Sequence, residues 1–145
     1  MIIREATTAD IPEIQRVRHA VLENRLSDPS LVPYKDFADY ITRRGKGWVA
    51  ENGGKTVGFS IISVLDNNVW ALFVEPGHDK MGVGRKLHEV MMDWYFTQTD
   101  TKAWLSTAPK TRAEQFYRIA GWTEVGVHGK GEVKFEMQKQ EWKAS

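Results

Sequence analysis

The sequence contains no cysteine, no long apolar run and almost no net charge. Without cysteine the chain forms no disulfides, no thiolate metal sites and no cysteine nucleophile. A formal net charge of +1 gives no strong field to favour nucleic acid or an anionic membrane as partner. No apolar segment is long enough to span a bilayer and the first residues lack a signal-peptide layout, so we expect a cytoplasmic protein.

What the sequence does contain is typical of one globular domain. Its 145 residues are long enough to bury a core, and 41% of them are hydrophobic while 27% are charged. There is no internal repeat, low-complexity tract or linker. No group of His, Asp and Glu has the spacing of a metal site, so we expect no bound metal. We therefore expect a single domain over residues 1–145.

Hydrophobic periodicity and turn residues predict the element order β-α-α-β-β-β-α-β-α-β-β. The predicted strands are Ile2–Glu5, Trp48–Asn52, Thr56–Leu65, Val69–Val74, Ala103–Thr107, Trp122–Val127 and Glu132–Gln138. The predicted helices run from about Thr8 to Leu26, over Tyr34–Arg43, from Val83 onward, and over Ala113–Ala120. This order indicates an α/β fold with a mixed sheet and helices on both faces.

A glycine turn, Gly82-Val-Gly84, lies between a predicted strand and a predicted helix. Glycine there allows φ > 0 and a close approach of backbone to a ligand, and the helix start offers free N–H groups to a phosphate. A purely steric role for these glycines stays open, because Gly-x-Gly alone is a weak signal. The dinucleotide fingerprint is excluded because position 87 is Leu, and the Gly-Lys-Ser/Thr of a phosphate loop is absent.

Two motifs together resemble the GNAT superfamily of N-acetyltransferases. The first comprises Val74-Glu-Pro76, Gly82-Val-Gly84 and Leu87. The second comprises Ala113-Glu-Gln-Phe-Tyr117 followed by Gly121-Trp122. Two motifs in the right order, separated by a strand, are more specific than either alone, and the element order matches over the whole chain.

The resemblance implies a single-domain fold with a mixed, mostly antiparallel sheet and helices on both faces. It also implies transfer of an acetyl group from acetyl-CoA, by direct attack, to a primary amine of a small molecule or peptide. The run Glu23–Pro29 is similar to that of a bacterial subgroup. The alternative is a non-catalytic acyl-CoA-binding sensor or regulatory module. Exposed sheet edges would allow a homodimer.

The resemblance further assigns the residues that contact CoA. They are Leu72, Phe73, Val74, Asp79, Lys80, Met81, Gly82, Val83, Gly84, Arg85, Lys110, Arg112, Phe116 and Tyr117. Two of them depart from the family pattern, which has Arg or Gln at the place of Asp79 and Asn at the place of Lys110. An acid near a pyrophosphate should repel it, unless Asp79 points outward or Lys80 compensates.

Catalytic roles are implied for three residues. The backbone N–H of Val74 would stabilise the oxyanion, and Tyr117 would act as general acid toward the leaving thiol. A lysine-type amine has a pKa of about 10.4 and must lose a proton before it attacks. Asn68 stands where the family often has the carboxylate base, so Glu75 is the best substitute of a weak set, and a water relay remains open. The other members of that set are His78, Asp66, Glu124 and His128.

Several further residues are expected to lie outside the CoA site. His88 lies off the apolar stripe of its helix and is expected to face solvent. Trp48 and Trp70 are expected in the core or on a sheet face. The acceptor site should be built by the first two helices and the last hairpin, in the region of Arg18, His19, Glu23, Arg25, Asp28, Tyr34 and Tyr40.

Overall fold

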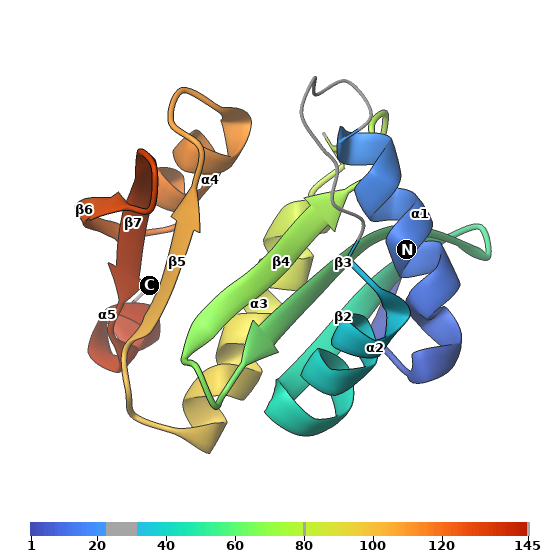
Figure 1. Ribbon diagram of the computed structural model, residues 1–145, viewed down its shortest axis with the longest axis horizontal. Coiled ribbons are helices and arrows are strands. Elements are labelled where there is room, and N and C mark those ends of the chain that lie inside the picture. The colour runs from blue at the N-terminus through green and yellow to red at the C-terminus, as the bar shows by residue number, and fades with distance from the viewer. Residues whose placement is uncertain (23–31, 80, 145) are drawn as a thin grey trace.

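The sheet of this protein is continuous through seven strands in the described part of the chain, in the order β1-β2-β3-β4-β5-β7-β6 (Figure 1). The computed structural model describes residues 1–22, 32–79 and 81–144. All neighbouring strands are antiparallel except β4 and β5, which are parallel. The strands are β1 (Ile2–Glu5), β2 (Gly45–Asn52), β3 (Lys55–Ser63), β4 (Asn68–Val74), β5 (Ala103–Thr107), β6 (Thr123–His128) and β7 (Glu132–Met137).

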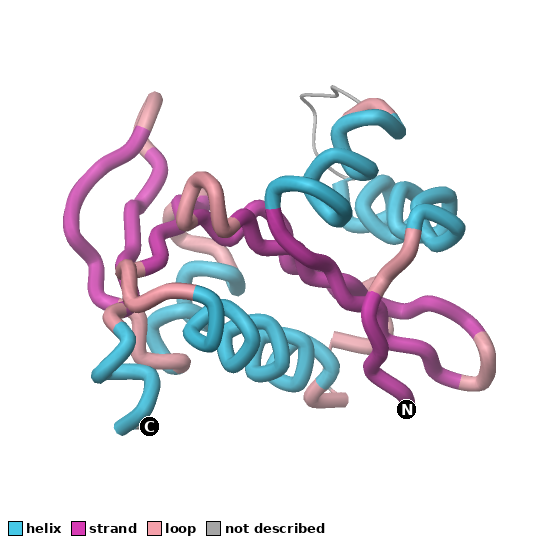
Figure 2. The backbone as a smooth tube through the Cα atoms, turned by 90° about the horizontal axis from the view of Figure 1, so that it is seen from below, coloured by secondary structure: helices cyan, strands magenta, loops and turns pink. Residues whose placement is uncertain are grey.

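Helices lie on both faces of the sheet (Figure 2), as the sequence predicts. None of the described helices is long and apolar enough to cross a membrane. The helical elements are η1 (Thr8–Asp10), α1 (Ile11–Leu22), α2 (Tyr34–Asp39), the π-helical turn η2 (Tyr40–Arg44), α3 (Val83–Gln98), α4 (Arg112–Ile119) and α5 (Lys139–Ala144). The predicted order is confirmed and α5 adds to it, while η1 forms the start of the first predicted helix.

Two hydrophobic cores sandwich the sheet. One lies between the sheet and α3 and also receives side chains from α4 and α5, and the other lies between the sheet and α1, α2 and η2. Strand β3 belongs to both cores, because every residue from Thr56 to Ser63 is buried. Trp48 is buried in the first core, as predicted. The central strands are thereby held in place by packing on both faces of the sheet.

A β-bulge in β4 determines which side chains face each core. Ile61 pairs with Ala71 while Ile62 pairs with Val69, so Trp70 is the extra residue. An extra residue shifts the alternation of side chains by one position. Beyond the bulge, Leu72 therefore packs on the α3 side of the sheet.

The two halves of the sheet are joined at one end only. Between β4 and β5 a single residue pair, Asn68 and Trp104, is in register in the described structure. The Asn68 side-chain amide donates to the Trp104 carbonyl (3.1 Å), and the Trp104 backbone N–H donates to the Asn67 carbonyl (2.9 Å). The Trp104 indole N–H donates to the Asp66 carbonyl (3.1 Å). Toward their carboxyl ends the two strands diverge (Figure 1).

Helix α5 was not predicted because it is only six residues long and mostly polar. Its position depends on contacts distant in sequence. The Trp142 ring packs against the core on the α3 side, and its indole N–H donates to the Asp93 carboxylate (2.8 Å). Glu141 accepts a hydrogen bond from the Gln138 backbone N–H (2.9 Å), which caps the first turn.

Tyr95 on α3 fastens the turn that precedes β4. Its side chain is fully buried. Its hydroxyl donates a hydrogen bond to the Thr101 carbonyl (3.0 Å) and accepts one from the Asn67 side-chain amide (2.8 Å).

The substitution Tyr95→Phe removes both hydrogen bonds and leaves their partners unsatisfied. We therefore expect the free energy of unfolding, measured by urea denaturation, to fall by about 1–2 kcal/mol. Tyr34→Phe, at a 50% exposed position, is the matched control and should change it by less than about 0.5 kcal/mol. Equal losses in the two variants would contradict this role.

Candidate functional site

A cavity of about 970 Å³ opens where β4 and β5 diverge. It is bounded by the end of β4, the turn into α3, the first turns of α3 and the whole of α4, with one residue from α1. The lining residues are Val21, Leu72, Phe73, Val74, Pro76, Asp79, Gly82, Gly84, Arg85, His88, Thr111, Arg112, Ala113, Phe116, Tyr117, Ile119 and Ala120.

One wall of this cavity is a polar backbone edge. The Glu75 N–H donates to the Val57 carbonyl of β3 (2.7 Å). Along an antiparallel strand, successive residues direct their N–H groups to opposite sides, so the N–H of Val74 points away from β3 toward β5. Since β5 has already diverged there, the N–H of Val74 is available to a ligand.

The turn between β4 and α3 leaves the start of α3 open. Gly82, the residue before the helix, adopts φ 75° and ψ 12°, a left-handed conformation that favours glycine. No described side chain caps this helix, and its first turn contains no acid. Gly84 follows in that turn, and a Cβ there would lie 3.6 Å from Val74 Cγ2 and 3.7 Å from Phe116 Cε1. The free N–H groups and the dipole at this helix end suit an anion.

Asp79 and Arg112 form an ion pair across the cavity. Asp79 comes from the turn before α3 and Arg112 from the start of α4, and both line the cavity. The hydrogen bond from Arg112 lowers the pKa of Asp79 below its usual range, so the acid is ionised and its charge is compensated. The sequence analysis considered Lys80 as the compensating cation, and it did not foresee that α4 supplies Arg112.

Helix α4 contributes aromatic side chains to the cavity. The Thr111 hydroxyl caps the helix by accepting from the Glu114 N–H (3.3 Å). One helical turn further on, Phe116 and Tyr117 contact each other edge to face at 5.2 Å between ring centroids. The Tyr117 side chain is 7% exposed, and burial raises its pKa. The hydroxyl therefore keeps its proton at neutral pH, and no described residue forms a hydrogen bond with it.

His88 on α3 corrects a prediction. It was expected to face solvent, but it is 3% exposed and lines the cavity. Its Nε2 accepts a hydrogen bond from the Trp122 indole N–H (2.9 Å), and its ring packs edge to face on Phe116 (5.5 Å). Burial lowers the pKa of His88 to about 4. The apolar stripe of α3 did not predict the burial of His88, because Phe116 of α4 and Trp122 cover the side of the helix on which His88 lies.

Glu75 lies behind β4 and outside the cavity. Its Oε1 accepts from Arg16 Nη1 (2.5 Å) and lies 3.4 Å from Lys55 Nζ. Its Oε2 lies 3.4 Å from His78 Nδ1. The hydrogen bond from Arg16 lowers the pKa of Glu75, which makes it a weaker base than a free carboxylate. The contacts suit an anchor that ties the end of β4 to α1.

The structure brings together most of the residues that the sequence assigned to CoA. Those that line the cavity are Leu72, Phe73, Val74, Asp79, Gly82, Gly84, Arg85, Arg112, Phe116 and Tyr117. Three other described residues assigned to CoA do not line it: Val83 is buried in the core, and Met81 and Lys110 are exposed. The Lys110 backbone adopts φ 61° and its N–H donates to Glu114 Oε1 (2.7 Å). Lys80 lies outside the described residues.

Several lining residues were not predicted. His88 follows Gly84 by four positions, and Ala120 follows Phe116 by four. Residues four apart share a helix face, so this spacing is the signal that could have found them. Ile119 is 88% exposed, which is unusual for a large apolar side chain and marks the rim of the cavity.

The region expected to hold the acceptor is described in part. Val21 shows that the end of α1 reaches the cavity. Tyr40 stacks on Trp70 with ring centroids 3.9 Å apart and planes at 5°, so Trp70 is on a sheet face, as expected. Tyr34 is half exposed. Glu23, Arg25 and Asp28, together with the run Glu23–Pro29, lie outside the described residues.

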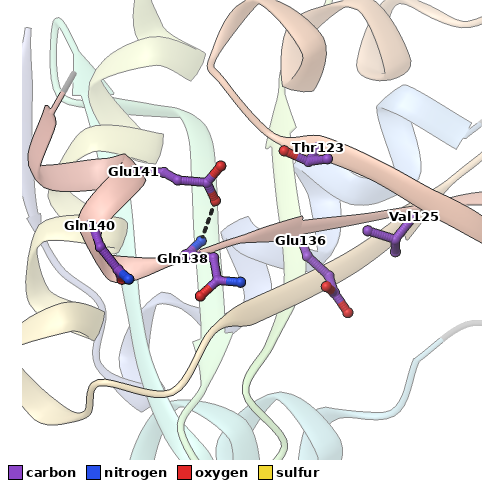
Figure 3. Close-up of a pocket in the computed structure, with 6 residues that line it drawn as sticks. All are labelled: Thr123, Val125, Glu136, Gln138, Gln140 and Glu141. Atoms are coloured by element: carbon purple, nitrogen blue, oxygen red, sulfur yellow. Dashed lines mark hydrogen bonds between the residues drawn. The ribbon is translucent and has the colours of Figure 1, made fainter.

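A second, smaller cavity of about 400 Å³ lies beside β6, β7 and α5 (Figure 3). It is lined by Thr123, Val125, Glu136, Gln138, Gln140 and Glu141. Its two carboxylates already have partners: Glu136 lies 3.1 Å from Lys102 Nζ, and Glu141 caps α5. Among the described residues, no group of three or more side chains suits a metal ion, here or elsewhere. The cavity beside β4 is therefore the better candidate site.

Residues 11–122 match the sequence profile of the Acetyltransferase (GNAT) family, which covers most of the chain. The protein belongs to the GNAT family. That match contains β4, the glycine turn, α3 and α4, and so includes every residue that lines the cavity. No curated protein matches the sequence closely enough to count as a relative.

Solved structures share the GNAT fold of this chain. The ribosomal-protein-alanine N-acetyltransferase of Brucella melitensis is 19% identical with a TM-score of 0.79, covering 95% of this chain and 99% of that one. The PaiA N-acetyltransferase of Thermoplasma acidophilum, in complex with coenzyme A, is 13% identical with a TM-score of 0.80, covering 94% and 98%. YncA of Salmonella typhimurium, with its cofactor acetyl-CoA, is 22% identical with a TM-score of 0.75, covering 95% and 93%.

The lowered pKa of His88 predicts how stability depends on pH. The folded protein disfavours the charged imidazolium form of His88. The contribution of neutral His88 to the free energy of unfolding is therefore complete above the ordinary pKa of 6.5, and it is lost as pH falls toward about 4. We expect the wild type to lose about 3 kcal/mol more than His88→Gln between pH 7 and pH 4. Urea denaturation at several pH values measures the difference.

Carboxylates whose pKa is lowered, such as Asp10 and Glu114, lose their contribution in both proteins, so their effect cancels. His128→Gln, at an exposed position, is the matched control and should keep the wild-type pH dependence. Parallel stability curves for the wild type and His88→Gln would contradict the prediction.

Proposed function

We propose that the protein is an N-acetyltransferase that moves an acetyl group from acetyl-CoA to a primary amine of a small molecule or peptide by direct attack. One observation carries the proposal. The free N–H of Val74 and the protonated hydroxyl of Tyr117 belong to one cavity that ends at the uncapped start of α3. Family membership supports acetyl transfer as the reaction class.

The residues present fit acetyl-CoA. The anionic part of the molecule would lie at the start of α3, where free N–H groups and Arg85 provide positive potential. The pantetheine arm would follow the exposed backbone edge at Leu72 and Val74, as an added strand does. Phe116 and the other apolar lining residues would cover the arm from the side of α4.

Acetyl-CoA supplies an activated thioester. We propose that the Val74 N–H stabilises negative charge that develops on the thioester oxygen. Tyr117 would donate its proton to the leaving thiol, whose ordinary pKa is about 8.5. Burial raises the pKa of Tyr117, so its hydroxyl is protonated at neutral pH and can donate a hydrogen bond to the leaving sulfur, but the same shift makes it a weaker acid.

We propose that water, rather than Glu75, removes the proton of the attacking amine. Glu75 does not line the cavity, and Arg16 and Lys55 surround its Oε1. Asp79, the one carboxylate among the described lining residues, is paired with Arg112. An unassisted amine would make the reaction faster as pH rises toward its pKa of about 10.4.

The acceptor would enter from the end of α1, where Val21 reaches the cavity. A ribosomal-protein-alanine N-acetyltransferase shares the fold, so a peptide amine is a reasonable first acceptor to test alongside small amines. A cytoplasmic location and a homodimer stay predictions.

The experiment that tests the proposed function is release of free thiol from acetyl-CoA in the presence of a panel of polyamines, amino acids and peptide amines. We expect amine-dependent release by the wild type. In Tyr117→Phe, kcat should fall about 10²-fold or more while CoA affinity stays near wild type, because the proton donor is lost and the ring remains.

Tyr95→Phe changes a buried tyrosine that does not line the cavity, so it is the matched control and should keep wild-type turnover. Tight CoA binding without thiol release on any amine would favour the non-catalytic sensor instead. Wild-type turnover in Tyr117→Phe would remove Tyr117 from the mechanism.

The Asp79–Arg112 pair predicts an unusual effect on affinity. Asp79→Asn removes the one carboxylate that pairs with the Arg112 guanidinium among the described residues, so the guanidinium becomes available to the ligand phosphates. We expect CoA to bind about 3- to 10-fold more tightly, as measured by calorimetry at low salt, with a gain that shrinks as salt rises. Pantetheine, which has no phosphate anhydride, should show no gain.

Asp100→Asn is the matched control, since Asp100 is also paired with a cation, Lys139, but lies far from the cavity lining. It should bind CoA like the wild type. Weaker CoA binding by Asp79→Asn would show that Asp79 supports the site through structure alone.

A further inference from the structure

His88 is a buried polar group that the proposed chemistry leaves unused. Its side chain lines the cavity from α3, and its ring lies 5.5 Å from that of Phe116 and 6.2 Å from that of Tyr117. It lies four residues beyond Gly84, which places it about 6 Å deeper along the helix than the phosphate-binding turn. A group at this depth faces the part of a ligand that lies between the phosphates and the reacting end.

The hydrogen bond with Trp122 fixes where the proton of His88 resides. An indole N–H can only donate, so His88 Nε2 must offer a lone pair to Trp122 Nε1 (2.9 Å). A neutral imidazole carries one proton, which must then be on Nδ1. Burial keeps the ring neutral at physiological pH.

The Nδ1–H group of His88 has no acceptor in the described part of the chain. Trp122 accounts for the one hydrogen bond of this side chain. Buried side-chain atoms without a partner occur among the described residues at Glu75 Oε2 and His78 Nδ1, and His88 Nδ1 is not one of them. Nδ1 is therefore accessible and not fully enclosed by the core, and the cavity that His88 lines is the space next to it.

We propose that His88 is a cosubstrate-binding residue whose Nδ1–H donates a hydrogen bond to an amide carbonyl of the pantetheine arm of the acyl-CoA. This inference rests on the proposed function. The ligand atom must be an acceptor, since Nδ1–H is a donor. It must also be neutral, because the neighbouring rings of Phe116, Tyr117 and Trp142 would desolvate an anion without compensating its charge. The amide carbonyls of pantetheine meet both conditions.

Two variants separate the two hydrogen bonds of His88. In His88→Asn the side-chain amide nitrogen takes about the place of Nδ1, so it keeps the donor toward the cavity. In His88→Gln the longer amide takes about the place of Nε2, so it keeps an acceptor for Trp122 and loses the donor. Calorimetric titration with CoA, and with 3′,5′-ADP as the probe that lacks the arm, then reports on each part of the ligand.

We expect His88→Gln to bind CoA about 3- to 10-fold more weakly than the wild type and 3′,5′-ADP equally well, as the loss of one hydrogen bond predicts. His88→Asn should bind CoA within about two-fold of the wild type but melt at a lower temperature, because Trp122 loses its acceptor. Nitrogen NMR of the wild type should show a protonated Nδ1 and an unprotonated Nε2 at neutral pH.

Several results would overturn the proposal. One is an equal loss of affinity for CoA and 3′,5′-ADP in His88→Gln, which indicates general damage. Others are unchanged CoA affinity in that variant, or a proton on Nε2. A wild type that binds no CoA would overturn this proposal and the proposed function together, whereas wild-type binding of CoA with unselective losses in the variants overturns this proposal alone.

Discussion

The candidate site depends on the way β4 and β5 are joined. One residue pair, Asn68 with Trp104, holds two otherwise antiparallel units side by side, and hydrogen bonds from that corner fix the angle between them. Because pairing stops there, the backbone edge of β4 stays unsatisfied along Leu72 and Val74, and α4 can approach it from the other unit. An unpaired strand edge needs hydrogen-bond partners, and at this cavity water or a ligand can supply them.

Charge around the site is balanced by residues from different elements. Asp79 is compensated by Arg112 of α4, and Glu75 by Arg16 of α1 and Lys55 of β3. Each pair also connects the turn after β4 to a neighbouring element. The start of α3 is the exception, since it carries positive potential with no described acid to offset it in its first turn. This asymmetry makes one end of the cavity more favourable to an anion than the other.

Local patterns in the sequence were enough to predict the strands, the glycine turn and the position of Tyr117, because each depends on residues adjacent in the chain or one helical turn apart. His88 was mispredicted because its burial depends on Trp122, which is 34 residues away. The ion pair between Glu75 and Arg16 was not predicted, because the two residues are 59 positions apart in the sequence. Lys110 occupies a site position in the second family motif, but its backbone is left-handed, its side chain is exposed and it does not line the cavity. Contacts between segments distant in the sequence depend on how the elements pack, and the hydrophobic periodicity of a single element contains no information about that packing.

The divergence of β4 from β5 also divides the sheet into two antiparallel units. Strands β2, β3 and β4 form a meander of neighbouring hairpins, and β5, β7 and β6 form a second antiparallel unit later in the chain. Within each unit several residue pairs are in register, whereas the seam between the units has one such pair in the described structure. A ligand bound along this seam would bridge the two units, so their cohesion would rise with its concentration.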